Sequence, residues 1–199
     1  MAVSETSPTL MSDLAAVVAD ILAITVALRT GGQAIGSGVI WRADGLVVTS
    51  AHVVTGAQRE RDGTEVVLAD RRRLPGSLVK WDRQSDLALL KVEARDLPAA
   101  VWGDSDRLRP GELVLAAGHQ FGLPAAVVAG VVHAAPARGG RAGSGWIQAD
   151  LRLAPGNSGG PMTAASGRVI GVNAMVAGRL ALAVPSRVVQ AFVMRSAGP

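Results

Sequence analysis

The chain contains no cysteine and no tyrosine, and only two phenylalanines and four tryptophans. The lack of cysteine excludes disulfide bonds, thiolate metal sites and a cysteine nucleophile. The scarcity of aromatic side chains disfavours binding of single-stranded nucleic acid, which depends on base stacking. The three histidines, His52, His119 and His133, are far apart and lack the spacing of metal ligands. We therefore expect no metal site and no nucleic-acid partner.

No lysine or arginine occurs in the first 28 residues. Arg29 is the first basic residue, whereas Glu5, Asp13 and Asp20 are acidic, so the N-terminus has the wrong charge for a secretory signal. The apolar stretch 14–28 is interrupted by Asp20 and is shorter than the roughly 20 residues that cross a bilayer. We expect no membrane contact and, by default, a cytoplasmic location.

Hydrophobic residues make up 49% of the 199 residues, with 24 glycines and 10 prolines between them. Short valine-rich runs separated by glycine and proline predict an all-β protein. We expect strands at 21–28, 65–69, 74–81, 86–92, 112–118, 126–134, 145–149, 160–164, 168–176 and 180–184, a hairpin over 33–50 with its turn at 43–45, and helices at 13–20 and 187–195. Two halves of about six strands each suggest two small barrels.

The expected domain organisation is a single protein domain in two halves. It comprises a flexible tail over 1–11, a first half over 12–102, a linker over 103–111, and a second half with the C-terminal helix over 112–199. The linker is assigned to a polar, turn-rich stretch that ends in Pro110 and Gly111.

The stretch 154-APGNSGGP-161 places one serine, Ser158, in a run of mostly small or backbone-restricting residues. A serine hydroxyl is a weak nucleophile that needs a general base and a third group to orient that base. Glycines next to it permit backbone N–H groups to converge on an oxyanion. The candidate donors lie in the oxyanion-hole segment Gly156, Asn157 and Ser158, with the N–H groups of Gly156 and Ser158 favoured.

Two further residues are candidates for the partners of Ser158. His52 follows a predicted strand in 49-TSAHVVTGA-57, and Asp86 stands at the head of the predicted buried strand 86–92. The order His, Asp, Ser along the chain is that of chymotrypsin among the convergent triads. The residues alone leave simpler alternatives open, namely a turn serine, a surface or capping histidine and a strand-end aspartate.

The segments "TSAHVV", "SDLALLKV" and "APGNSGGP" together resemble the trypsin-like serine proteases, specifically the HtrA/Deg branch, and the similarity extends over residues 12–195. The resemblance implies two perpendicular six-stranded antiparallel β-barrels with short terminal helices and a site between the barrels. It implies a serine endopeptidase with a polypeptide substrate and no cofactor, in which His52 is the general base, Asp86 orients it and Ser158 is the nucleophile. The alternatives are a catalytically silent binding or chaperone scaffold, and a protease that only a partner activates.

The sequence departs from that branch at both ends. HtrA proteins usually carry PDZ domains after the protease domain, and many form trimers through aromatic residues near the N-terminus. This chain ends soon after its predicted closing strands, and no aromatic residue precedes Trp41. We therefore expect a protease domain without a PDZ domain, and the resemblance leaves a trimer open.

The same resemblance implies a first substrate pocket, which receives the side chain before the cleaved bond. Its lining would be Leu153, Ala174, Met175 and Val176. None of these residues is acidic, which disfavours arginine or lysine at that position. We expect a small or medium aliphatic side chain there.

Overall fold

The structure, a computed structural model, describes residues 8–55, 63–136 and 145–195. It opens with helix α1 (Pro8–Ala23), which is longer than the predicted helix. Residues 8–11, expected in a flexible tail, belong to this helix, and proline is well tolerated in a first helical turn. Residues 1–7 of that tail lie outside the described residues.

The prediction of a strand from residue 21 was wrong, because α1 continues to Ala23 and the first strand begins at Thr25. The reason is tertiary packing. Val17 and Ile21, one helical turn apart, pack against Leu115 and Ala117 of the second half of the chain. This burial outweighs the β propensity of the isoleucine.

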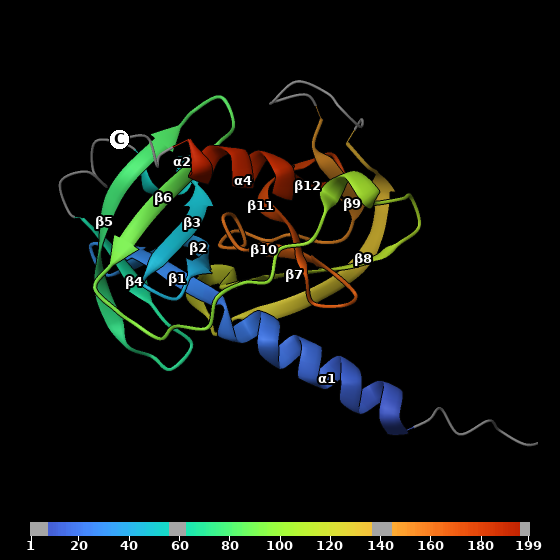
Figure 1. The fold of residues 1–199 in the computed structure, drawn as a ribbon, viewed down its shortest axis with the longest axis horizontal. Coiled ribbons are helices and arrows are strands. Elements are labelled where there is room, and N and C mark those ends of the chain that lie inside the picture. Colours follow the sequence, from blue (N-terminus) through green and yellow to red (C-terminus); the bar gives the residue numbers. More distant parts are fainter. Residues whose placement is uncertain (1–7, 56–62, 137–144, 196–199) are drawn as a thin grey trace, which may run out of the picture.

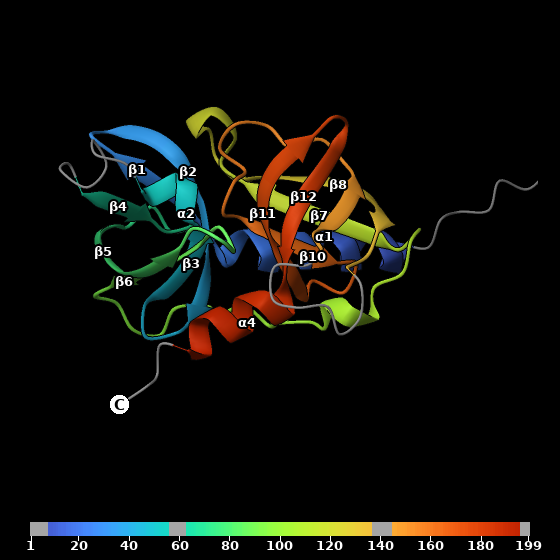
Figure 2. The ribbon, with the colours of Figure 1, turned by 90° about the horizontal axis from the view of Figure 1, so that it is seen from above.

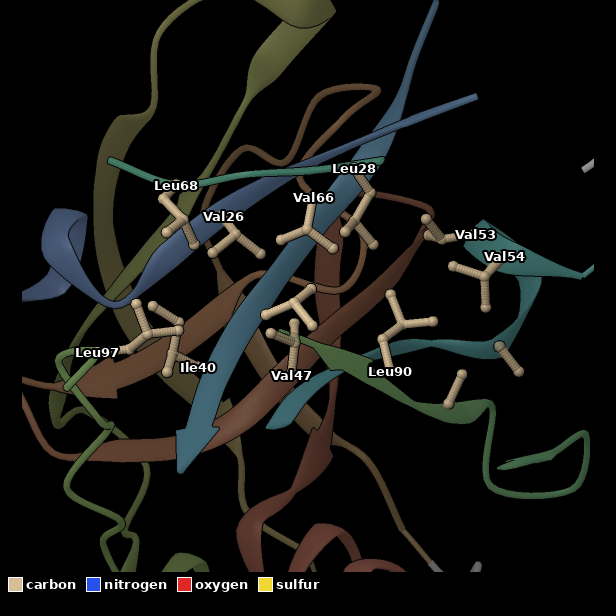
Figure 3. Packing of buried hydrophobic residues seen from close by; sticks show 13 residues of the cluster. Val26, Leu28, Ile40, Val47, Val53, Val54, Val66, Leu68, Leu90 and Leu97 are labelled. Atoms are coloured by element: carbon tan, nitrogen blue, oxygen red, sulfur yellow. The ribbon is translucent and has the colours of Figure 1, made fainter. Parts of the chain in front are cut away.

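Six strands close the first barrel, in the order β1-β2-β3-β6-β5-β4. They are β1 (Thr25–Thr30), β2 (Gln33–Arg42), β3 (Leu46–Ser50), β4 (Thr64–Val67), β5 (Arg73–Asp82) and β6 (Leu87–Val92), and the short helix α2 (Ala51–Val54) follows β3. The predicted hairpin over 33–50 is confirmed as β2 and β3. Valine and leucine side chains from these strands fill the barrel, with Val26, Ile40, Val47 and Leu90 at 0–1% exposure (Figure 3).

The second barrel has the strand order β10-β11-β12-β9-β8-β7. Its strands are β7 (Leu113–Gly118), β8 (Ala126–Ala134), β9 (Ile147–Asp150), β10 (Pro161–Ala164), β11 (Val169–Ala177) and β12 (Leu180–Pro185), with single 3-10 turns η1 (Ser105–Arg107) and η2 (Gln120–Gly122). Read from β7, this order is 7-8-9-12-11-10, which repeats the 1-2-3-6-5-4 order of the first barrel. The expected fold of two six-stranded antiparallel barrels is confirmed.

The final helix α4 (Ser186–Met194) lies across the junction of the two barrels (Figures 1 and 2). Its residues Val188 and Phe192 join a buried cluster that includes Leu87 of the first barrel and Val172 of the second. Lys80 of β5 also lies over the Phe192 ring, 3.9 Å from its centroid. The junction is thus a shared apolar core, which holds the facing edges of the barrels in a defined relation. Among the described residues, no helix is long and apolar enough to cross a membrane.

Candidate active site

His52 and Asp86 meet at the edge of the first barrel. His52 lies on α2, directly after β3, and Asp86 directly precedes β6, the neighbour of β3 in the sheet. The Nδ1 atom of His52 lies 2.8 Å from Oδ2 of Asp86, and the backbone N–H of His52 donates to Oδ1 at 3.0 Å. The Asp86 carbonyl also accepts from the N–H of Ala51 at 3.0 Å. One residue therefore fixes both the helix start and the imidazole ring.

This pairing decides which imidazole nitrogen can act as a base. A carboxylate can only accept hydrogen bonds, so it favours the tautomer with the proton on Nδ1 of His52. In that neutral tautomer Nε2 carries the lone pair. Asp86 is 15% exposed at its side chain and has a left-handed backbone (φ 53°), a conformation that aspartate tolerates better than most residues. The short connection between β5 and β6 thus aims the carboxylate at the ring.

Ser158 lies in the tight turn before β10. Gly156 (φ 101°) and Gly159 (φ 85°) on either side of it have backbone conformations that favour glycine. Side chains there would also collide with neighbouring backbone, at Gly156 with the carbonyl oxygen of His119 and at Gly159 with that of Ser37. The glycines predicted to shape this turn are required by both conformation and space.

The turn leaves two backbone donors unused. The N–H of Asn157 donates to the carbonyl of Ala154 at 3.0 Å, and the N–H of Gly159 donates to Asn173 at 2.7 Å. Within the described part of the chain, the N–H groups of Gly156 and Ser158 have no acceptor. Of the three residues in the predicted oxyanion-hole segment, Asn157 thus already uses its N–H within the turn, and the other two remain as donors.

The hydroxyl of Ser158 donates to the carbonyl oxygen of Ala174 on β11 at 2.9 Å. Catalytic hydrogen bonds are often incomplete in a structure without substrate and form when the substrate is bound. Rotation of one side chain about its Cα–Cβ bond moves this hydroxyl without any change in the backbone.

The four residues of the predicted substrate pocket differ in their surroundings. Met175 and Val176 are 45% and 49% exposed, and Leu153 is half-buried against the core of the second barrel. Ala174 is 1% exposed, and its side chain packs in the core between the barrels. Ala174 therefore meets Ser158 through its backbone carbonyl and not through its methyl group.

A cavity of about 480 Å³ lies beside these residues. It is lined by Asp150, Leu151, Arg152, Leu153, Val176, Gly178 and Arg179. Leu153 precedes the serine turn in sequence and Val176 lies on β11, so the cavity joins two of the predicted pocket residues. The two arginines that line it lack a salt bridge within the described ranges.

Two contributors to the site were missed by the sequence analysis. Ser37 on β2 and Phe121 in η2 both form hydrogen bonds to the serine turn, residues 154–160. Ser37 donates to the carbonyls of Gly156 and Ser158, and the N–H of Phe121 donates to the carbonyl of Pro155. Ser37 had a signal, because a polar residue between two glycines interrupts the apolar pattern of a strand. Phe121 acts through its backbone N–H, for which side-chain chemistry offers no signal.

Comparison with known proteins agrees with this geometry. The family of the trypsin-like peptidase domain matches residues 36–172, which include His52, Asp86 and Ser158. The chain belongs to this family. A probable periplasmic serine endoprotease of the DegP-like type from Marinomonas sp. (strain MWYL1) is 42% identical over 172 residues, covering 81% of this chain and 35% of that protein. A putative serine protease, HhoB, from Synechocystis sp. (strain ATCC 27184 / PCC 6803 / Kazusa) is 40% identical over 166 residues, covering 79% and 39%.

Similar solved structures come from the HtrA branch, as the sequence resemblance implied. The HtrA-type protease AlgW with a tripeptide has a TM-score of 0.81 and 33% identity over 92% of this chain and 62% of that one. AlgW with a decapeptide has a TM-score of 0.79 and 29% identity over 92% and 66%. The chain spans about a third of the length of the two curated relatives above.

The other two histidines come from the second barrel. Among the described residues, no group of three or more histidine and acidic side chains is arranged to hold a metal ion. His133 lies on β8. His119 is half-buried at the end of β7, and its carbonyl oxygen packs against Gly156.

The burial of His119 predicts a pH dependence of stability. Burial lowers the pKa of His119 below its ordinary value of 6.5, and its Nδ1 atom is buried with no hydrogen-bond partner in the described part of the chain. Between the lowered pKa and about 6.5, the unfolded chain binds more protons than the folded one. Stability is thus full above about pH 6.5 and falls as the pH drops through that window.

A His119→Gln variant is therefore expected to lose less thermal stability than the wild type between about pH 7.5 and about pH 5. Thermal unfolding followed by circular dichroism at several pH values measures this difference. His133→Gln is the control and should keep the wild-type slope. An equal slope in the wild type and His119→Gln would contradict the prediction.

Proposed function

We propose that the chain is a serine endopeptidase that cleaves polypeptides through an acyl-enzyme on Ser158. The observation that carries the proposal is the hydrogen-bonded pair of His52 and Asp86. The region that matches the family also contains Ser158. This serine lies in a glycine turn in which two N–H donors are unused. A pure binding scaffold would need neither the oriented imidazole nor the unused donors.

The reaction follows from the roles these atoms can take. Oγ of Ser158 attacks the carbonyl carbon of the substrate, and its proton passes to Nε2 of His52. Asp86 then faces an imidazolium and stabilises its charge. The proton moves on to the leaving nitrogen as the C–N bond breaks, and a water molecule hydrolyses the resulting ester by the same route in reverse.

The negative oxygen of the tetrahedral intermediate would be bound by the N–H groups of Gly156 and Ser158. Removing one such donor in a serine protease typically costs about 10²–10³ in rate, or about 3–4 kcal/mol. Because these donors are already held by the turn, little reorganisation is needed when the charge develops. In this reaction the hydroxyl of Ser158 leaves the Ala174 carbonyl and turns toward His52 when the substrate is bound.

The edge of β11 offers a place for the substrate backbone. β11 pairs with β12 as far as Ala177, but it pairs with β10 only as far as Val172. On that edge Asn173 exchanges hydrogen bonds with Gly159 and Gly160, and beyond Asn173 the edge has no partner strand within the described ranges. An extended peptide could add there as a strand, with its scissile bond beside Ser158 because the Ala174 carbonyl contacts that side chain.

We further propose that a small or medium aliphatic side chain precedes the cleaved bond. The walls provided by Leu153 and Val176 are apolar, and Met175 next to them is exposed. Arg152 and Arg179 outnumber the single acidic residue of the lining, Asp150, so a positively charged substrate side chain would meet a net like charge. Both features disfavour cleavage after arginine or lysine.

Digestion of an unfolded protein, with the fragments identified by mass spectrometry, tests activity and specificity together. We expect fragments that end mostly in valine, alanine or similar residues, and none with the Ser158→Ala variant. Fragments ending in arginine or lysine would overturn the specificity. No fragments from a folded wild-type sample would favour a silent scaffold or a protease that needs an activating partner.

Two further expectations stay predictions. The cytoplasmic location is based on the acidic N-terminus, whereas the DegP-like relative is described as periplasmic. The trimer that is common in this branch is one alternative for this chain. Fractionation of the native source and sedimentation of the purified protein would decide them.

A further inference from the structure

Ser37 is a fully buried serine in the middle of β2, a strand of the first barrel. Its hydroxyl donates to the carbonyl of Gly156 at 2.7 Å and accepts from the N–H of His119 at 2.9 Å. Its own N–H donates to the carbonyl of Ser158 at 2.9 Å. One residue of the first barrel thus binds the serine turn on both sides of Asn157 and also binds the segment after β7.

These contacts restrict the peptide planes around the unused donors. The Gly156 carbonyl belongs to the plane that follows Gly156, and Ser37 holds it. The Pro155 carbonyl belongs to the plane that precedes Gly156, and the N–H of Phe121 holds it at 2.9 Å. In a trans peptide the N–H points away from the carbonyl of the same plane, and the described residues contain no cis peptide. The direction of the Gly156 N–H is therefore fixed from both sides.

We propose that Ser37 is a positioning residue that keeps the N–H groups of Gly156 and Ser158 directed at the oxyanion. The inference rests on the proposed function, since it assigns to Ser37 a role in that same reaction. Ser37 does not touch the reacting atoms. Its hydroxyl holds the Gly156 carbonyl and its backbone N–H holds the Ser158 carbonyl, and without the hydroxyl the turn gains freedom to rotate the donors out of place.

The surroundings of Ser37 leave little room for another group to take over this role. A side chain on Gly118 would lie 3.1 Å from the Ser37 hydroxyl, and one on Gly36 would lie 3.0 Å from the Ser158 carbonyl. β2 therefore approaches the end of β7 and the serine turn so closely that only a small side chain fits at position 37. Removal of the hydroxyl would leave the Gly156 carbonyl and the His119 N–H without their partner, which is costly for buried groups.

Ser186 provides a matched control. It is also buried, at 1% exposure, and its hydroxyl donates to the carbonyl of Gly103 at 2.8 Å and accepts from the N–H of Ser105 at 3.1 Å. Ser37→Ala and Ser186→Ala thus remove the same kind of buried serine, each linked to one glycine carbonyl and one backbone N–H. Only the first contacts the serine turn.

The experiment compares kcat, KM, thermal stability and amide hydrogen exchange of the full chain in the wild type and the two variants. We expect similar losses of melting temperature in both. Only Ser37→Ala should lose kcat, by about 10–100-fold with KM nearly unchanged, because the donors act mainly in the transition state. Only Ser37→Ala should speed exchange of the Asn157, Gly159 and Gly160 amides, by about tenfold or more.

The outcomes separate this inference from the proposed function. A wild type without turnover would refute the proposed function, while the exchange rates would still decide whether Ser37 holds the turn. Equal exchange in the two variants, or a kcat loss in Ser37→Ala no greater than in Ser186→Ala, would overturn the positioning role. If Ser37→Ala does not fold, Ser37→Cys keeps a weaker donor at the same place and should show the same effects at smaller size.

Discussion

The Ser158→Ala variant is expected to lose about 10⁵–10⁶-fold in kcat, because the nucleophile and its base act as one unit in proteases of this type. A methyl group cannot form the acyl-enzyme, so only the oxyanion donors and substrate binding would still accelerate hydrolysis. Steady-state hydrolysis of a chromogenic peptide measures the loss. Labelling with a fluorophosphonate probe reports the same hydroxyl directly.

Ser166 offers the control for this substitution. It is an exposed serine in the turn between β10 and β11, next to a glycine, and so resembles Ser158 in local sequence. Ser166→Ala should keep both hydrolysis and labelling. Labelling that persists in Ser158→Ala would mean that another residue is the nucleophile. A folded wild type that takes up no label would mean that the site is inactive at rest.

The Asp86→Asn variant is expected to lose about 10⁴-fold in kcat while remaining folded. Asparagine has the same shape, tolerates the left-handed backbone of residue 86 and can still accept from the N–H of His52 through its oxygen. Its amide nitrogen, however, cannot accept from Nδ1. The imidazole would then favour the tautomer with the proton on Nε2, which cannot take a proton from Ser158.

Asp82→Asn is the matched control for that variant. Asp82 is the last residue of β5, directly before the connection that carries Asp86, and it accepts from the N–H groups of Gln84 and Ser85. The hydrogen bond from the Ser85 hydroxyl and these backbone contacts hold its pKa below the usual value. Its substitution perturbs the turn without touching His52, so kcat should change little. A loss below about tenfold in Asp86→Asn would contradict the orienting role.

Several strands could be predicted from sequence because the runs of apolar residues that form them and the turn residues that end them are both local. The hairpin over 33–50 combines valine-rich runs with a turn at Gly45, whose φ of 97° favours glycine. Strand β8 was expected at 126–134 and lies there. By contrast, the boundary between α1 and β1 was misplaced, because Ile21 is held in the helix by residues nearly a hundred positions away.

The candidate site shows the same division. His52, Asp86 and Ser158 were recognisable because each stands in a short segment that suits its chemistry and because the three segments together resemble a protease family. The backbone groups of Ala174 and Phe121 were not, since a carbonyl or N–H is present in every residue and only its position gives it a role. Ala174 was expected in the substrate pocket, but its side chain is buried between the barrels and its carbonyl contacts Ser158.

The sequence by itself determined the all-β class and the two halves of about six strands, because periodicity and turn residues are local properties, and its resemblance to a protease family singled out the three residues of the candidate triad. Only the tertiary structure decided how Ser37 of one barrel holds the serine turn of the other, and which N–H groups of that turn stay unused. Those features depend on hydrogen bonds between groups up to 121 positions apart, from Ser37 to Ser158. Such bonds are satisfied only once both barrels have closed and packed together.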